Sequence, residues 1–137
     1  MLDHATPLFI GSKFEMNNAI SQGGAVITND FTEATFKECE FRTNVVQTGE
    51  GGGIAIVDFS EPVLNGTIFA ANEAQNGGAV YSTGEAAPVM LGCTLDSNTA
   101  VLSGGGASFA GNSSALVEDC DIRYLFLTRT CDELHNS

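Results

Sequence analysis

The chain has 137 residues, enough for one domain, and 17 acidic residues against 5 lysines and arginines give it a formal charge of −12. This acidity argues against nucleic-acid partners and against an anionic membrane surface, because like charges repel. The apolar runs fall far short of the ~20 residues of a membrane-spanning helix, and the first residues form no signal peptide. We therefore expect either an intracellular protein or a piece of a longer secreted chain, and we favour the second because the repeat begins almost at residue 7.

A repeat of about 27 residues runs along the sequence. Its first marker is an apolar residue followed three positions later by asparagine, and the pairs are Phe14/Asn17, Phe41/Asn44, Phe69/Asn72 and Leu95/Asn98. Each pair leads to a glycine motif, read as Gly23-Gly24-Ala25-Val26, Gly52-Gly53-Ile54, Gly77-Gly78-Ala79-Val80 and Gly105-Gly106-Ala107. The asparagines are 27, 28 and 26 residues apart. A fixed period of this length indicates a stacked repeat architecture.

A second marker keeps the same period. It is a small residue between two apolar ones, and the small residues are Ser12, Cys39, Thr67, Cys93 and Cys120. The apolar residues before it are Phe9, Phe36, Leu64, Met90 and Val117, and those after it are Phe14, Phe41, Phe69, Leu95 and Ile122. Short apolar runs that alternate with period two and end at glycine or asparagine indicate strands and turns, not helices.

One repeat, followed in chain order, predicts three short strands. They are residues 25–27, 34–36 and 39–41, separated by a polar loop at 28–33 and a bend at 37–38. Strands of successive repeats would stack about 4.8 Å apart and hydrogen bond in parallel. The sequence therefore predicts an all-β fold, a right-handed parallel β-helix (solenoid) of about five coils over residues 1–123. Residues 124–137 break the pattern and are expected to form a C-terminal cap or tail, or to mark the edge of a longer chain.

Stacking would place like positions in columns. The apolar columns form the core, and the ladder residues Asn17, Asn44, Asn72 and Asn98 bond to one another and to turn backbone. Glycine pairs mark corners with positive φ or close backbone approach. Cys39, Cys93 and Cys120 are expected inside as small buried residues. A disulfide between Cys93 and Cys120 would be strained, and Cys131 lies outside the pattern.

These paired motifs resemble the repeats of the chlamydial polymorphic outer-membrane proteins, a family of right-handed parallel β-helices. Phe14/Asn17, Phe41/Asn44 and Phe69/Asn72 match the family's Phe-x-x-Asn, and residues 23–26 and 77–80 match its Gly-Gly-Ala-(Ile/Leu/Val). The resemblance covers residues 7–123. It implies an extracellular or cell-surface β-helix, often one that acts in adhesion.

No catalytic constellation emerges from the sequence. His4 and His135 lie near the two ends, and no cofactor is expected. The acidic residues Asp30, Glu33, Asp58, Glu61 and Glu85 are expected to form a solvated rim at one loop, with weak Ca²⁺ binding as the alternative. Paired carboxylates could instead serve glycoside hydrolysis. A fragment of a polysaccharide-active enzyme (glycoside hydrolase or lyase) with a carbohydrate substrate is therefore the second hypothesis.

The outward positions favour binding over catalysis. They are expected to be Leu8, Thr35, Val63, Val89 and Leu116 on one strand and Val26, Ala55, Val80 and Ser108 on another. Strand propensity alone could explain such columns, but a stacked apolar column also suits a docking surface. We predict a non-catalytic structural or adhesive module that binds a protein partner, or the rest of a longer chain, with no membrane insertion. Its interface residues would be Leu8, Val26, Val63, Val80, Val89 and Leu116.

Overall fold

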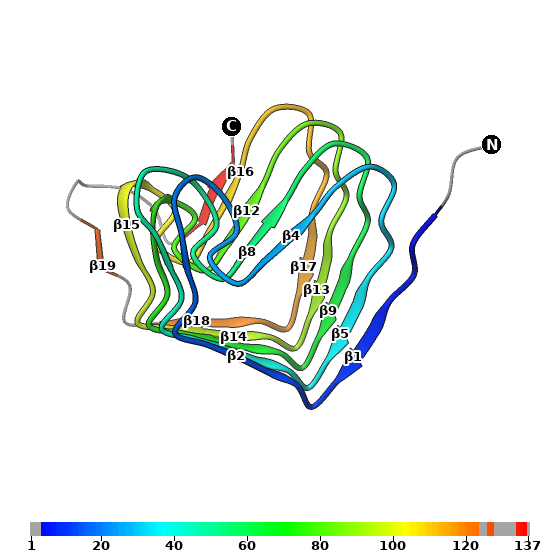
Figure 1. Ribbon diagram of the computed structural model, residues 1–137, viewed down its shortest axis with the longest axis horizontal. Helices are drawn as coiled ribbons and strands as arrows, with labels where there is room; N and C mark the ends of the chain where they lie inside the picture. The colour runs from blue at the N-terminus through cyan, green and yellow to red at the C-terminus, as the bar shows by residue number, and fades with distance from the viewer. Residues whose placement is uncertain (1–3, 124–125, 128–133, 137) are drawn as a thin grey trace.

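The fold is an all-β parallel solenoid. The computed structural model describes residues 4–123, 126–127 and 134–136. Their strands form four sheets of five strands each, and in every sheet a strand pairs with the strands one turn before and one turn after it. Four complete turns therefore separate the first strand of a sheet from its last. Figure 1 looks along the stack, so that successive turns overlie one another.

We name the sheets A to D in the order in which the chain meets them, and all pairings are parallel. Sheet A contains β1 (Leu8–Ile10), β5 (Thr35–Lys37), β9 (Val63–Asn65), β13 (Val89–Leu91) and β17 (Leu116–Glu118). Sheet B contains β2 (Lys13–Glu15), β6 (Glu40–Arg42), β10 (Ile68–Ala70), β14 (Thr94–Asp96) and β18 (Asp121–Arg123). Sheet C contains β3 (Asn18–Ala19), β7 (Val45–Val46), β11 (Glu73–Asn76), β15 (Thr99–Ser103) and β19 (Phe126–Leu127). Sheet D contains β4 (Val26–Thr28), β8 (Ile54–Ile56), β12 (Val80–Ser82), β16 (Ala107–Phe109) and β20 (Leu134–Asn136).

Each turn contains four strands, so the predicted number of three is wrong. The strands that were not predicted are those of sheet C, which directly follow the ladder asparagines. They are as short as two residues, and β7, β11 and β15 each bury one residue, so no alternation can be recognised. A regular signal does exist, because a small or apolar residue stands two positions after each asparagine: Ala19, Val46, Ala74 and Ala100.

The core consists of the two apolar columns that the sequence predicts. In sheet A the column is Phe9, Phe36, Leu64, Met90 and Val117, and in sheet B it is Phe14, Phe41, Phe69, Leu95 and Ile122. The middle members are fully buried, whereas those in the first and last turns are partly exposed. Rings stack between turns, with centroids 4.6 Å apart for Phe14 and Phe41 and 4.8 Å for Phe41 and Phe69. Each buried large side chain contributes roughly 1.5–3 kcal/mol, and the core exists only when turns are stacked.

Two adjacent glycines form the corner that precedes sheet D in each turn. The first has positive φ, as in Gly77 with φ 62°. The second allows neighbouring turns to approach closely. A β-carbon built on Gly78 would collide with the carbonyl oxygens of Gly105 and Thr99 in the next turn. The chain can therefore turn here only with glycine at both positions.

The described residues of the predicted C-terminal cap continue the stack. Residues 126–127 form β19, which pairs with β15, and residues 134–136 form β20, which pairs with β16. They extend sheets C and D in register. The other residues of segment 124–137, including Cys131, lie outside the described residues, so the role of this segment as a cap stays a prediction. Within the described ranges, no helix has the length and apolar character needed to cross a bilayer.

Candidate binding face and the ladders that support it

The outer face of sheet A presents the apolar column that the sequence predicts. Leu8, Thr35, Val63, Val89 and Leu116 are Cα partners along the five strands. Leu8 is 61% exposed and Leu116 is 48% exposed, while the residues between them are half-buried. Parallel sheets usually have both faces covered, and here the inner face is the core. The outer face of sheet A is therefore a flat surface with an apolar centre line.

A second outward column widens this surface. Two residues further along the same strands lie Ile10, Lys37, Asn65, Leu91 and Glu118. Ile10 is 60% exposed and Leu91 is half-buried. This column is absent from the predicted interface, although the two-residue period between Leu8 and Ile10 signals it. We call Leu8, Ile10, Val63, Val89, Leu91 and Leu116 the sheet A patch.

Val26 and Val80 do not face outward, so this part of the predicted interface is wrong. Both are Cα partners of Ile54. Val80 is fully buried, and Val26 packs against the core. The outward positions of sheet D lie one residue later, at Ile27, Ala55, Tyr81 and Ser108. The predicted column therefore mixed inward and outward positions.

The glycine runs explain this error in register. In two repeats a third glycine stands where the others have alanine, so residues 51–54 and 104–107, not 52–54 and 105–107, align with Gly-Gly-Ala-Val. A run of three glycines contains two possible pairs, and choosing the later pair shifts the strand by one residue. A shift of one residue moves every side chain to the opposite face of the sheet.

The outer face of sheet D is less open than that of sheet A. Its outward residues Ala55 and Ser108 are buried. The glycine corner lies against this face, since a β-carbon on Gly104 would lie 2.9 Å from Cβ of Ser108. Sheet A thus keeps exposed apolar residues at both ends of its outward column, whereas on sheet D only Ile27, in the first turn, is an exposed large apolar residue among those described.

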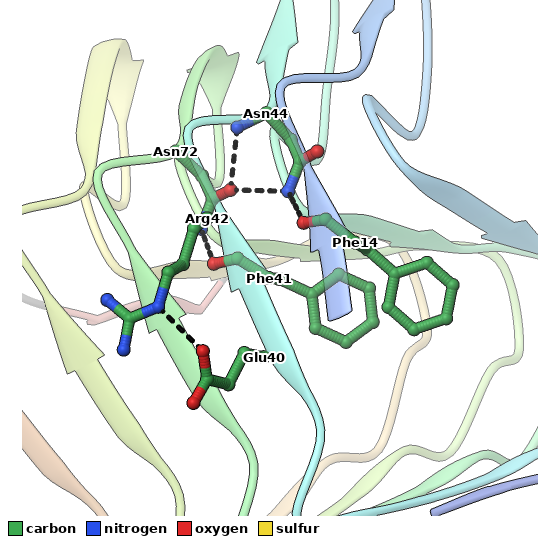
Figure 2. Close-up of polar contacts among 6 residues, drawn as sticks. All are labelled: Phe14, Glu40, Phe41, Arg42, Asn44 and Asn72. Carbon is green, nitrogen blue, oxygen red and sulfur yellow. Dashed lines mark hydrogen bonds and ion pairs between the residues drawn. The ribbon is translucent and has the colours of Figure 1, made fainter. Parts of the chain in front are cut away.

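The four predicted ladder asparagines stack at the corner between sheets B and C. Figure 2 shows two of them, Asn44 and Asn72. Nδ2 of Asn44 donates to Oδ1 of Asn72 at 2.9 Å and to the carbonyl oxygen of Phe14 at 2.8 Å. The backbone N–H of Asn44 donates to the same Oδ1 at 3.0 Å. Asn72 makes the corresponding three bonds to Asn98 and Phe41. The buried amide of Asn72 therefore bonds to the turn before it and to the turn after it.

This ladder holds a corner that is conformationally costly. The residue before each asparagine has positive φ: 54° at Met16, 56° at Thr43, 55° at Ala71 and 58° at Ser97. None of them is glycine, and a β-branched residue such as Thr43 rarely adopts this conformation. Each such residue costs on the order of 1–3 kcal/mol, which the buried amide bonds offset. The ladder thereby fixes the angle between sheets B and C.

The small column faces inward between sheets A and B, and its side chains donate to carbonyl groups of the preceding turn. The donor and acceptor residues are Cys39 and Phe9, Thr67 and Phe36, Cys93 and Leu64, and Cys120 and Met90. Cys39, Cys93 and Cys120 are free thiols, so Cys93 and Cys120 are not bridged. Burial raises the pKa of the Cys93 thiol to about 12.

Alkaline pH should destabilise the fold through Cys93. Its pKa rises from an ordinary 9.0 to about 12 on folding, so above about pH 9 the unfolded chain loses the proton first. The contribution of the neutral thiol to the stability of the fold is fully present below about pH 9 and is lost as the pH rises toward 12. Cys93→Thr introduces the residue that occupies the same column at Thr67, and it should fold. Its urea midpoint should fall less steeply between about pH 8 and about pH 11 than that of the wild type. Equal slopes would show that another group is responsible.

The loop between sheets D and A carries the predicted acidic rim and a stack of rings. Asp30, Glu33, Asp58, Glu61 and Glu85 are all exposed. Phe31 stacks on Phe59 with centroids 4.9 Å apart, and His4 stacks on Phe31 at 5.6 Å. His4 Nδ1 also lies 3.4 Å from Oε1 of Glu33. Among the described residues, no group of three or more His, Cys, Asp or Glu gathers as metal ligands, and no pocket is found.

The outer face of sheet B carries charged residues in its first two strands and its last, with Ile68 and Ala70 on the middle strand. Arg42 Nε donates to Oε2 of Glu40 at 2.8 Å (Figure 2). This hydrogen bond from Arg42 lowers the pKa of the Glu40 carboxyl. Lys13 and Glu15 in the first turn are the Cα partners of Glu40 and Arg42. Opposite charges therefore alternate along this edge of the sheet, in contrast to the apolar surface of sheet A.

Comparison with known proteins agrees with the repeat motifs. The family described as "Right handed beta helix region" matches residues 23–125. Over 111 residues the chain is 35% identical to "Probable outer membrane protein pmp6" of Chlamydia pneumoniae, and the alignment covers 78% of this chain but 8% of that protein. The chain thus spans a small fraction of that relative's length. No solved structure was found to match it. With four parallel sheets, a repeat near 27 residues and this match, the chain belongs to the right-handed β-helix family.

Proposed function

We propose that this chain is a non-catalytic β-helix module at a cell surface and that it binds a protein partner through the sheet A patch. The observation that carries this proposal is the apolar column on the outer face of sheet A. Its end residues Leu8 and Leu116 remain 61% and 48% exposed. A stacked apolar column on a flat face is the type of surface that marks an interaction site.

The composition of the face suits a protein partner. The sheet A patch provides an apolar centre, and Lys37, Asn65 and Glu118 provide polar groups beside it on the same strands. Interfaces between proteins have this anatomy, with an apolar core and a polar rim. A flat sheet whose inward residues accept hydrogen bonds from the small column would bind with little loss of conformational entropy.

The cell-surface location rests on the matched relative. That protein is described as a probable outer membrane protein, and this chain corresponds to 8% of its length. In residues 4–123 the strands are joined by short loops, and such a stack supports a role in presenting a surface to a partner. The exposed carboxylates of the acidic rim lie on the loops that lead into sheet A, and Glu61 stands two residues before Val63 of the sheet A patch.

Replacing Val63 and Val89 together with lysine should abolish binding and leave the fold intact. The two valines are Cα partners on neighbouring turns and point away from the core. We expect labelled wild-type chain to bind cultured epithelial cells in flow cytometry, and the double variant to lose most of this signal. A matched control is the pair Ile68→Lys and Thr94→Lys, which are Cα partners on the outer face of sheet B in the same two turns. This control adds the same charge and should bind normally.

Pretreatment of the cells identifies the chemistry of the partner. Protease treatment should remove the binding, whereas periodate oxidation of surface sugars should leave it. Normal binding by the folded Val63→Lys/Val89→Lys variant would place the docking surface elsewhere. Equal losses of binding in both double variants would show that the added positive charge, and not the sheet A patch, causes the loss.

A further inference from the structure

The loops between sheets D and A stack in register, and one column of these loops begins with aromatic rings. The N–H of Glu61 donates to the carbonyl oxygen of Thr32, and later loops repeat this bond to the loop before them. This register aligns one residue from each turn in what we call the ring column: His4, Phe31, Phe59, Glu85 and Asn112. The first three rings stack, with centroids 5.6 Å and then 4.9 Å apart. The stack of rings ends at Phe59, because Glu85 has no ring.

Phe59 is open to solvent although turns precede and follow it. The residue is 45% exposed. The loops of Glu85 and Asn112 come after it, so its exposure does not arise at an open end of the stack. One face of its ring lies against Phe31 with an interplanar angle of 4°. No ring of the described residues stacks on the other face, which we call the open face of Phe59.

Three carboxyl groups of the acidic rim accompany the open face of Phe59. Asp58 precedes Phe59, Glu61 follows it by two residues, and Glu85 is the next member of the ring column. All three are exposed, and none makes a side-chain hydrogen bond or an ion pair within the described part of the chain. The loops that lead from sheet D to sheet A contain no lysine or arginine; they are residues 29–34, 57–62, 83–88 and 110–115. The negative charge is therefore not balanced within these loops.

Acidic residues on sheet B, by contrast, have basic partners. Oε2 of Glu40 lies 2.8 Å from Nε of Arg42, and Oδ2 of Asp121 lies 3.4 Å from Nη2 of Arg123. The open face of Phe59 and its carboxylates therefore form a surface whose missing complement is a cation. A partner that supplied a positively charged group here would provide the charge complementarity that these loops lack.

An arginine side chain suits this surface better than the other cations of proteins. Its guanidinium is planar, stacks on aromatic faces and donates paired hydrogen bonds to carboxylates. A cation above the face of an aromatic ring is attracted by the negative charge of that face. On the open face of Phe59 a guanidinium would extend the stack of rings by one layer and would lie beside the column position of Glu85. The compact ammonium of lysine has no flat face to stack.

From these observations we propose that the open face of Phe59 binds an arginine side chain from an exposed segment of a protein partner. Asp58, Glu61 and Glu85 would accept hydrogen bonds from the guanidinium. This site is separate from the sheet A patch and uses different chemistry, namely aromatic stacking and charge in place of apolar burial. Binding here weakens as the salt concentration rises, whereas apolar docking on sheet A does not.

A short arginine peptide tests the site by nuclear magnetic resonance. The probe is the peptide Gly-Arg-Gly-Arg-Gly, acetylated and amidated at its ends, added to ¹⁵N-labelled chain. We expect its addition to shift the amide signals of residues 58–61 and 85. The Hδ protons of the peptide's arginines should move upfield, because they would lie over the ring of Phe59. A peptide with lysine in place of arginine should bind about threefold more weakly and show little upfield shift.

Substitutions separate the contribution of the ring from that of the charge. Phe59→Leu keeps an apolar side chain, and it should weaken binding of the arginine peptide about threefold and abolish the upfield shift. Phe59→Tyr should retain both. Glu61→Gln together with Glu85→Gln should weaken binding about fivefold. The matched control, Glu38→Gln with Glu73→Gln, removes the same charge from exposed positions outside these loops and should change binding less than about twofold.

The spectra also report whether each variant is folded. Normal binding by the folded Phe59→Leu variant, or equal losses of binding in the two double variants, would overturn the proposal. So would an absence of shifts at millimolar peptide, or shifts centred outside residues 58–61 and 85. Equal binding of the two peptides would assign the contact to charge alone, and tighter binding of tetramethylammonium would assign it to a small quaternary amine. Either result would exclude an arginine site.

Discussion

Replacing Asn72 with alanine is expected to lower the free energy of unfolding by about 3–5 kcal/mol, because this one truncation removes hydrogen-bond partners from groups in two neighbouring turns. The backbone N–H and Nδ2 of Asn44 both lose their acceptor at Asn72 Oδ1. The carbonyl oxygen of Phe41 loses a donor, as does Oδ1 of Asn98. The site is fully buried, so water cannot replace these bonds without entering the corner. Urea unfolding followed by far-ultraviolet circular dichroism measures the loss.

Two controls separate the ladder from a general effect of truncation. Glu73→Ala changes the exposed neighbour of Asn72 and should alter stability by less than about 0.5 kcal/mol. Asn17→Ala lies at the exposed end of the ladder, where the side chain bonds to one turn only, and should cost less than Asn72→Ala. Equal unfolding midpoints for Asn72→Ala and Glu73→Ala would contradict a stabilising role of the ladder.

Gly78→Ala is expected to destabilise the protein at least as much as Asn72→Ala. It should lower the free energy of unfolding by more than about 4 kcal/mol or abolish cooperative unfolding. The added β-carbon would collide with the carbonyl oxygens of Gly105 and Thr99. These are backbone atoms of the next turn and cannot rotate away as a side chain does. Relief would require the two turns to separate, which would break the parallel pairing on both sides of the corner. Circular dichroism and urea unfolding report both outcomes.

Gly92→Ala is the matched control for this substitution. Gly92 has φ 59°, but a β-carbon there would meet nothing within 4 Å. Its replacement should cost only the strain of a left-handed alanine, about 1–2 kcal/mol. Gly78 has no positive φ, so a loss there no larger than that at Gly92 would contradict close contact between turns as the reason for the second glycine.

Sheets A and B were predictable because one uninterrupted motif spans both. From Phe9 through Phe14 to Asn17 the spacing is the same in later turns, as in Phe36, Phe41 and Asn44. No insertion falls inside this stretch, so the inward and outward positions follow from the sequence alone. The core columns, the asparagine ladder and the outward column from Leu8 to Leu116 could therefore be assigned before the structure was known.

Sheets C and D were harder to predict because their sequence patterns are ambiguous. The short strands of sheet C bury a single residue such as Val46 or Ala74, and one residue has no period. In sheet D a third glycine, Gly53 in one turn and Gly106 in another, made the register uncertain by one residue. The second outward column of sheet A could have been predicted, since it lies two residues after the first. The inward positions of Val26 and Val80 became clear only when the strands of sheet D had been paired.

An irregularity in sheet C shows how this architecture can change in length. Between β11 and β15 the register passes from Ala74 and Ala100 to Asn76 and Ser103, so β15 accommodates one additional residue. The additional length lies at the exposed residues Val101 and Leu102, outside the core. Single insertions are thus absorbed where the strand faces solvent, while a whole repeat enters or leaves without altering any column. Recombination between repeats would therefore yield longer or shorter relatives that fold with the same corners, and chain length in such a lineage is free to drift in steps of one turn.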